Sequence, residues 1–337
     1  WANKYSLNPN WDVSLSYDFQ WNDLEVFDTA KDVNMEHISN AATRGTHWLS
    51  LATAFTLADR LKMQASILGT FVDEKAHQVD KAPNKKKLTP GLFLSYQPFK
   101  KHELIFRAFY KTAYRMPTFN DLYYTDMGNA ALRPETVTQY NVGITYELTR
   151  KNKTFNYFRI GADAYYNYVT DKIISWPQGP QFRWTTLNLG KVDIRGIDAN
   201  AMATCQFPHN WTITGKLQYT YQEAIDITNP SDNYYRHQIP YIPWHSGSAI
   251  VMLNWNTWAL NYSFIVGERY NQQENIRYNH TQPWYTSDLS LQKRWQIKKV
   301  FLKCTAEVNN LLNQDYDVIL NYPMPMRNYR FSITAEF

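Results

Sequence analysis

Residues 158–168 read Phe-Arg-Ile-Gly-Ala-Asp-Ala-Tyr-Tyr-Asn-Tyr, with an apolar or aromatic side chain at nearly every second position. A β-strand sends successive side chains to opposite faces, so this period of two predicts a strand with one apolar and one polar face. Arg159, Asp163 and Asn167 share the polar face. We expect that face to line a lumen and the other to meet lipid. The predicted lipid-facing set is Phe158, Ile160, Ala162, Ala164, Tyr166 and Tyr168.

The same alternation recurs along the chain, for example over residues 140–148 and 329–337. Counting such segments gives about fourteen strands, with boundaries that are soft by about two to four residues. Residues 1–8 resemble the end of a further strand. The fourteen lie near residues 11–21, 47–57, 61–72, 88–98, 102–113, 136–149, 154–170, 192–207, 211–225, 244–255, 257–267, 284–296, 299–309 and 328–337.

The connections between these strands alternate in length. Bacterial outer-membrane barrels have short periplasmic turns and longer extracellular loops. The sequence therefore predicts an all-β fold, a transmembrane antiparallel up-and-down β-barrel of the Gram-negative outer membrane, with its long loops at one end. Short turns are expected at 58–60, 99–101, 150–153, 208–210 and 296–298, and long loops at 22–46, 73–87, 114–135, 171–191, 226–243, 268–283 and 310–327.

Composition excludes several other classes of protein. Charged residues make up 19% of the chain and aromatic residues 16%, and no apolar run approaches the roughly 18 to 20 residues of a membrane-spanning helix. The net charge of +5 is spread along the chain instead of gathered in a basic stripe, so we expect no nucleic-acid partner. Cys205 and Cys304 are too few for a disulfide framework or a zinc site, and both fall on the apolar face.

Tryptophans gather near the predicted short turns. An indole ring at a strand end can rest at the level of lipid headgroups, as in the aromatic girdles of membrane barrels. In a soluble barrel the same rings would plug the barrel ends, but a wholly polar face on so many strands leaves a soluble core little to pack with. The residues concerned are Trp11, Trp211, Trp255, Trp258 and Trp295.

Two segments resemble those of a known family. Residues 107–123 read Arg-Ala-Phe-Tyr-Lys-Thr-Ala-Tyr-Arg-Met-Pro-Thr-Phe-Asn-Asp-Leu-Tyr, followed by Gly-Asn at 128–129 and Leu-Arg-Pro-Glu-Thr at 132–136. This stretch resembles TonB-dependent outer-membrane receptors, in which an aromatic-Arg-Ala-Pro box precedes an extracellular loop and a Lys-Pro-Glu box starts the next strand. Met116 replaces the usual Ala and Ala130 the usual Pro, without changing the spacing.

The end of the chain carries the second resemblance. Residues 308–316 read Val-Asn-Asn-Leu-Leu-Asn-Gln-Asp-Tyr, and residues 322–327 read Tyr-Pro-Met-Pro-Met-Arg. They look like the family's Asn-Leu-Phe-Asp-Lys-Tyr and Pro-Gly-Arg patterns, with Met326 in place of Gly. The resemblance implies a barrel of about 22 strands, filled by an N-terminal plug that carries the TonB box. At this density of strands a full barrel would need more residues, so residues 1–337 are expected to be one barrel domain, the C-terminal part of a receptor without its plug.

The resemblance also implies a function. Members import ferric siderophores, cobalamin, haem and other scarce ligands, drawing on TonB through the plug. We therefore expect TonB-dependent uptake of a ferric siderophore or cobalamin, with haem less favoured, and outer-membrane lipid as a further partner. A passive porin or adhesin is the alternative, because composition and alternation fit it equally well. We expect no enzyme, because no compact pairing of His with an acid or Ser stands out.

Ligand capture is assigned to loop aromatics, because rings supply contact area at low entropy cost. No cofactor or metal is expected. His237, His245 and His280 could ligate haem iron, but lone loop histidines are more often surface residues. Asp121, Asp126, Asp226 and Asp232 lack the spacing of a calcium loop, so we interpret them as solvated. The candidate ligand-binding residues are Tyr123, Tyr124, Trp176, Phe182, Trp184, Tyr234, Tyr235, Arg236, Tyr270 and Tyr278.

Overall fold

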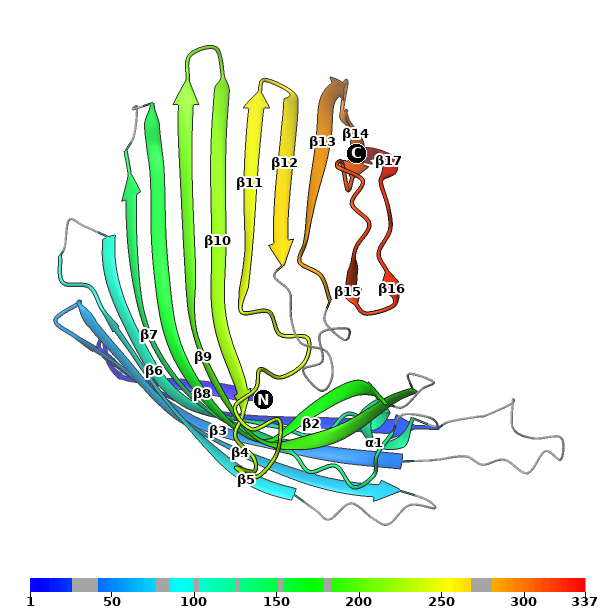
Figure 1. The fold of residues 1–337 in the computed structure, drawn as a ribbon. Coiled ribbons are helices and arrows are strands. Elements are labelled where there is room, and N and C mark those ends of the chain that lie inside the picture. The colour runs from blue at the N-terminus through cyan, green and yellow to red at the C-terminus, as the bar shows by residue number, and fades with distance from the viewer. Residues whose placement is uncertain are drawn as a thin grey trace.

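One curved antiparallel sheet dominates the computed structural model, which describes residues 1–25, 42–76, 85–99, 103–124, 128–150, 154–178, 183–267 and 281–336 (Figure 1). The sheet has 15 strands, and each pairs with its neighbour in chain order. This confirms the predicted all-β, up-and-down antiparallel architecture. In the described part of the chain no helix is long and apolar enough to cross a membrane.

The strand that was expected from residues 1–8 is present and pairs with the next strand along the chain. A separate two-stranded hairpin follows β14, and α1 is a short helix between β6 and β7. The elements are β1 (Ala2–Asn8), β2 (Trp11–Leu24), β3 (Ala42–Leu57), β4 (Leu61–Ala76), β5 (Lys85–Tyr96), β6 (Glu103–Arg115), α1 (Phe119–Tyr123), β7 (Glu135–Thr149), β8 (Phe155–Gln178), β9 (Arg183–Phe207), β10 (Trp211–Asp226), β11 (His245–Trp255), β12 (Trp258–Gly267), β13 (Trp284–Ile297), β14 (Val300–Asn309), β15 (Asp317–Ile319), β16 (Tyr322–Pro323) and β17 (Asn328–Glu336).

The prediction of a long loop over residues 171–191 was wrong. β8 and β9 continue through most of this range and remain paired as far as Gln178 and Arg183. The polar pair Asp171 and Lys172 looks like the start of a loop, but Asp171 takes a left-handed conformation (φ 53°) inside the strand, and β pairing resumes after it. The loop predicted over 310–327 likewise contains the short β15–β16 hairpin.

Short turns lie at one end of the sheet, and α1 and the β15–β16 hairpin lie toward the other (Figure 1). The turns between β3 and β4, and between β9 and β10, are at the predicted places. Ala58, Asp59, His209 and Asn210 adopt the positive φ angles that such tight turns require. Antiparallel pairing in chain order then places the strand ends that border the longer predicted loops at the opposite end, as predicted. We call that opposite end the mouth.

The register separates an apolar face from a polar one. Tyr146, Ile160, Ala201 and Leu217 are directly paired across four strands and share the apolar face, which we call outward. Asp163 lies on the other face, where it contacts Arg107, so the alternation predicted for residues 158–168 is confirmed. That second face is the one over which the mouth segments fold, and we call it inward.

The predicted tryptophans do lie beside the short turns. Trp211 and Trp255 stack with their ring centroids 5.2 Å apart, and Lys293 lies 4.3 Å from the Trp258 ring. Each of these rings, with Trp11 and Trp295, is between 36 and 43% exposed. A row of half-exposed indoles at one depth is typical of a headgroup girdle.

Polar contacts on the inward face run across the strands. Arg107 on β6 reaches over β7 to Asp163 on β8, with Nη2 3.1 Å from Oδ2. Gly143 on β7 lies between them in the register. A Cβ placed on Gly143 would stand 2.1 Å from Asp163 Oδ1, so this glycine makes room for the ion pair.

A buried charged network anchors α1 on the inward face. Arg44 Nε donates to Glu74 Oε2 at 2.6 Å, and Arg44 Nη1 donates to the carbonyl of Pro117 at 2.8 Å. Tyr123, the last residue of α1, donates its hydroxyl to the other oxygen of Glu74. Burial, and then the bond to Glu74, raises the pKa of Tyr123, so its hydroxyl remains a donor. Thr118 caps the helix.

Gly143→Ala should lower the free energy of unfolding by about 1–3 kcal/mol, because the added methyl group overlaps the Asp163 carboxylate. Gly215→Ala is the matched control, since a Cβ there meets nothing within 4 Å. Urea unfolding of the refolded barrel measures both. The cost should shrink in an Asp163→Ala background; an unchanged cost there would contradict the ion-pair explanation.

Glu74→Ala should destabilise the mouth by about 3–5 kcal/mol, because it leaves the Arg44 guanidinium buried without its carboxylate. Arg133→Ala is the control: Arg133 pairs with Asp171 at 2.7 Å, but its side chain is 62% exposed, so about 0–1 kcal/mol is expected. Urea midpoints and the rate of proteolytic cleavage next to α1 report the difference. Equal effects for the two variants would refute an anchoring role for Glu74.

Candidate functional site

The inward face near the mouth is covered by the connection between β10 and β11. Its Gln238 accepts from the Ala224 amide at 2.7 Å and donates to the carbonyls of Gln222 and Ile242. Ile239 is 3% exposed and packs with Val169, Val192, Ile194 and Ala224. These contacts hold the connection against β8–β10 in a defined position.

An open pocket of about 450 Å³ lies beside this connection. Most of its lining comes from inward positions of β10–β13. The hydrogen-bonding side chains are neutral and include Gln218, Thr220, Ser246 and Ser248. Tyr241, Trp284 and Val318 supply aromatic and apolar surface, and no charged residue is among the described residues that line it.

Trp284 forms one wall of this pocket. Its ring occupies the space that a side chain at Gly267 would need, since a Cβ there would be 2.8 Å from the indole Cε2. Tyr316 stacks on the ring at 5.1 Å between centroids. Burial, and then the nearby Asp288 carboxylate, raises the pKa of Tyr316, so its hydroxyl stays neutral.

The indole Nε1–H of Trp284 is buried and has no acceptor among the described residues. A buried donor without an acceptor costs about 1–3 kcal/mol. A ligand that displaced the atoms covering this N–H and brought a carbonyl or similar oxygen to it would recover that free energy. The arrangement therefore favours a ligand that carries neutral hydrogen-bond acceptors.

Two hairpins meet over the mouth. Trp184 on β9 donates its Nε1–H to the hydroxyl of Tyr322 on β16 at 3.2 Å, and the two rings lie 6.4 Å apart, edge to face. The residues are 138 positions apart in the chain. This contact brings the end of the long β8–β9 hairpin to the β15–β16 hairpin.

The sequence-predicted ligand residues fall into different environments. Tyr123 is 4% exposed and bonded to Glu74, so we assign it a structural role. Tyr124 is 53% and Tyr234 39% exposed, and Tyr235 is half-buried. Arg236 is exposed. Trp176 lies on β8 and Trp184 on β9, so neither is in a loop. Phe182, Tyr270 and Tyr278 lie outside the described residues.

The histidine and aspartate candidates do not gather into a metal-binding group in the described part of the chain. In the described ranges no group of three or more His, Cys, Asp or Glu residues is placed to hold a metal ion. His245 Nδ1 lies 2.7 Å from the hydroxyl of Tyr219, whose position is on the outward face. Asp226 and Asp232 accept backbone amides of their own connection, from Thr228 and Tyr234 respectively. His280 and Asp126 lie outside the described residues.

Sequence reasoning missed Trp284, Tyr316 and Tyr322. A usable signal existed for Trp284. It begins a strand in which Tyr285 and Leu289 mark the outward face, so its position is inward, where most neighbours are polar. A large aromatic side chain on a polar face beside a long connection is a candidate for ligand contact.

Comparison with known proteins shows the family of this chain. A family model described as TonB dependent receptor-like, beta-barrel matches residues 1–311. A vitamin B12 transporter BtuB of Vibrio vulnificus (strain YJ016) is 37% identical over 91 residues, which is 27% of this chain and 14% of that protein. BtuB of Vibrio vulnificus (strain CMCP6) is 22% identical over 340 residues, covering 99% of this chain and 49% of that protein.

Solved structures share the fold. The copper transporter OprC matches with a TM-score of 0.74 at 14% identity over 98% of this chain and 54% of OprC. BauA, the ferric preacinetobactin receptor from Acinetobacter baumannii, matches with a TM-score of 0.71 at 14% identity over 100% of this chain and 53% of BauA. The chain thus spans about half the length of these proteins. Because the family model covers most of its residues, the chain belongs to the TonB-dependent receptor β-barrel family, whose members are outer-membrane transport receptors.

Proposed function

We propose that this chain forms the outer-membrane barrel portion of a receptor for TonB-dependent uptake, with a cobalamin-type corrinoid as its ligand. The observation that carries the proposal is the similarity to proteins named vitamin B12 transporters, one of which aligns with 99% of the chain. A plug that engages TonB, and a closed barrel of about 22 strands, belong to the proposal for the whole protein.

The pocket at the mouth supports this choice of ligand. Its polar lining consists of hydroxyl and amide groups, and the buried indole N–H of Trp284 behind the wall has no acceptor in the described part of the chain. A corrinoid carries neutral carboxamide side chains around a flat ring system, which suit amide and hydroxyl partners and aromatic walls. An anionic chelate would instead favour cationic lining residues.

A ferric siderophore is the second candidate. It is favoured by the exposed Arg236 in the β10–β11 connection, next to Tyr234 and Tyr235, because a cation beside aromatic rings suits an anionic catecholate or carboxylate complex. Haem is less favoured than either. A passive porin or adhesin would need no saturable ligand site at the mouth.

Equilibrium binding to the complete receptor separates these ligands. Cyanocobalamin, ferric chelates and haemin are titrated in turn, and we expect saturable binding of cyanocobalamin alone. Saturable binding of a ferric chelate in its place would transfer the proposal to siderophores. If no probe binds and planar bilayers show open conductance, the porin alternative replaces it.

Trp284→Phe should weaken cyanocobalamin binding by about fivefold to tenfold, because it removes the N–H donor and keeps the ring that stacks on Tyr316. Trp295→Phe, at the opposite end of the same strand, is the control and should leave the dissociation constant unchanged. An unchanged constant for Trp284→Phe would exclude this wall as a ligand contact.

Replacing Trp176 and Trp184 together with Ala should raise the dissociation constant about tenfold, since interface hot spots are enriched in Trp. Tyr322→Phe is the informative companion variant, because it removes only the hydroxyl that accepts from Trp184. A tenfold effect from Tyr322→Phe as well would mean that the hairpin contact matters and not the indoles themselves. No effect in the double variant would reject the hairpin as a capture site.

A further inference from the structure

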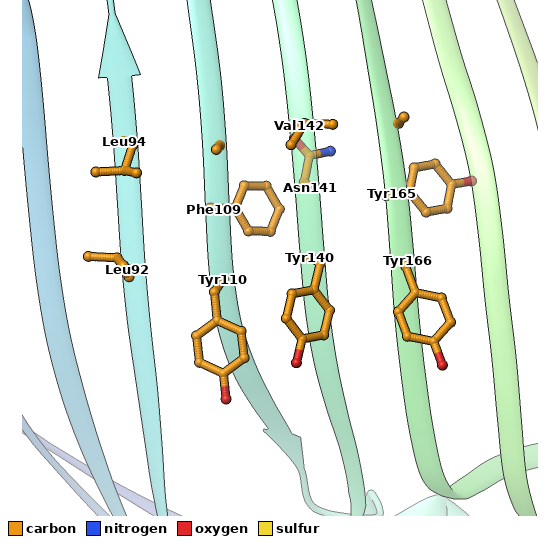
Figure 2. Close-up of a pocket in the computed structure, with 11 residues that line it drawn as sticks. Leu92, Leu94, Phe109, Tyr110, Tyr140, Asn141, Val142, Tyr165 and Tyr166 are labelled. Carbon is orange, nitrogen blue, oxygen red and sulfur yellow. The ribbon is translucent and has the colours of Figure 1, made fainter.

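A shallow groove of about 480 Å³ crosses the outward face of β5–β8 (Figure 2). Leu94, Ala108, Val142 and Ala164 follow one another across the four strands in the register, and all line the groove. The two alanines leave depressions on either side of Val142, which is 61% exposed. The groove is therefore a recess in an otherwise bulky apolar wall.

A ladder of tyrosines borders the groove on the side of the mouth. Tyr110, Tyr140 and Tyr166 are directly paired across β6–β8, with ring centroids 5.2 Å and 6.2 Å apart along the row. Figure 2 shows their hydroxyls pointing the same way along the strands, toward the end of β6 that leads to α1. Tyr140 also lies closer to the mouth end of β7 than to its turn end. A membrane-facing tyrosine places its ring in the apolar layer and its hydroxyl among headgroups.

Polar groups continue the row toward the mouth. Thr112, Thr138 and Tyr168 form the adjacent register row on the outward face, beyond the tyrosine hydroxyls. Their hydroxyls can donate to and accept from a sugar or phosphate headgroup. The outward face thus changes from apolar to hydroxyl-bearing between the row of the groove and the rows on its mouth side.

Arg195 lies at the end of the ladder. Its guanidinium carbon is 5.9 Å from the centroid of the Tyr166 ring, and its side chain is 57% exposed. Asp193 accepts from the Tyr166 hydroxyl at 2.8 Å and lies 3.6 Å from Arg195, so it fixes both groups while remaining mostly covered. Lys191 is a second exposed cation on this face, and half-buried Glu223 pairs with Arg195 in the register.

We propose that this groove binds an acyl chain of a phosphorylated glycolipid of the outer leaflet, with the phosphate held at Arg195 and Lys191. The apolar recess takes the chain, and the tyrosine ladder and threonines mark the depth at which the headgroup begins. Exposed cations beside an aromatic belt attract anionic headgroups. The inference rests on the proposed outer-membrane placement and is independent of which ligand the receptor imports.

The test uses the complete receptor in detergent, titrated with lipid A and followed by native mass spectrometry. Ala164→Phe fills the recess, and Arg195→Gln removes the cation. Each should weaken lipid A binding by about fivefold or more. Ala201→Phe, on the same outward face but outside the groove lining, is the control and should bind lipid A like the unaltered receptor.

Dephosphorylated lipid A is the second probe. The unaltered receptor should bind it more weakly than lipid A, and Arg195→Gln should then add no further loss. Equal binding of the two probes, or of lipid A to Ala164→Phe and Ala201→Phe, would overturn the proposal. Self-association that Ala164→Phe abolishes would assign the groove to a second copy of the chain instead. Cyanocobalamin binding should be unchanged in all three variants, so this test is separate from that of the imported ligand.

Discussion

A strand that crosses a bilayer must satisfy every backbone N–H and C=O within the protein, and in a β structure only neighbouring strands can do this. The continuous ladder from β1 to β14 and β17 follows from that constraint. Because side chains alternate along each strand, one face of the whole sheet becomes apolar and the other polar. Polar side chains on the inward face then need partners on other strands. Gly143 is an example, because the absence of a side chain there leaves the space in which Arg107 reaches Asp163.

At the mouth, the packing of buried apolar side chains positions the connecting segments. There the inward face carries the two buried apolar clusters that the described residues form, and these clusters join connecting segments to the sheet. Leu122 and Tyr123 of α1 pack with Ile173 of β8, while Ile239 packs with Val192. The connections are therefore held in place before any ligand arrives, so a bound ligand need not order them at its own entropic cost.

The period of two predicts most of the strands, because an alternation such as that of residues 158–168 depends only on the strand itself. It failed where the outcome depends on distant partners. The strand after Asp171 persists because β9 continues to pair with it, which no local pattern reveals. Tyr123 reads as an exposed loop aromatic, yet it is buried because Glu74, 49 residues earlier, accepts its hydroxyl. An aromatic residue outside the alternating pattern can pack within the protein or contact a ligand, and the local sequence around Tyr123 or Trp184 is the same in both cases.

The most direct test of this sheet, with its apolar outward face and polar inward face, is a spin-label scan along β8. The scan uses the complete receptor in lipid, after the native cysteines have been replaced. The collision rate with oxygen, which partitions into lipid, should rise and fall with a period of two residues. We expect maxima at Ile160, Ala162 and Ala164 and minima at Asp163 and Asn167. The opposite phase would reverse the assignment of the faces, and the absence of a period of two would contradict the membrane-spanning sheet itself.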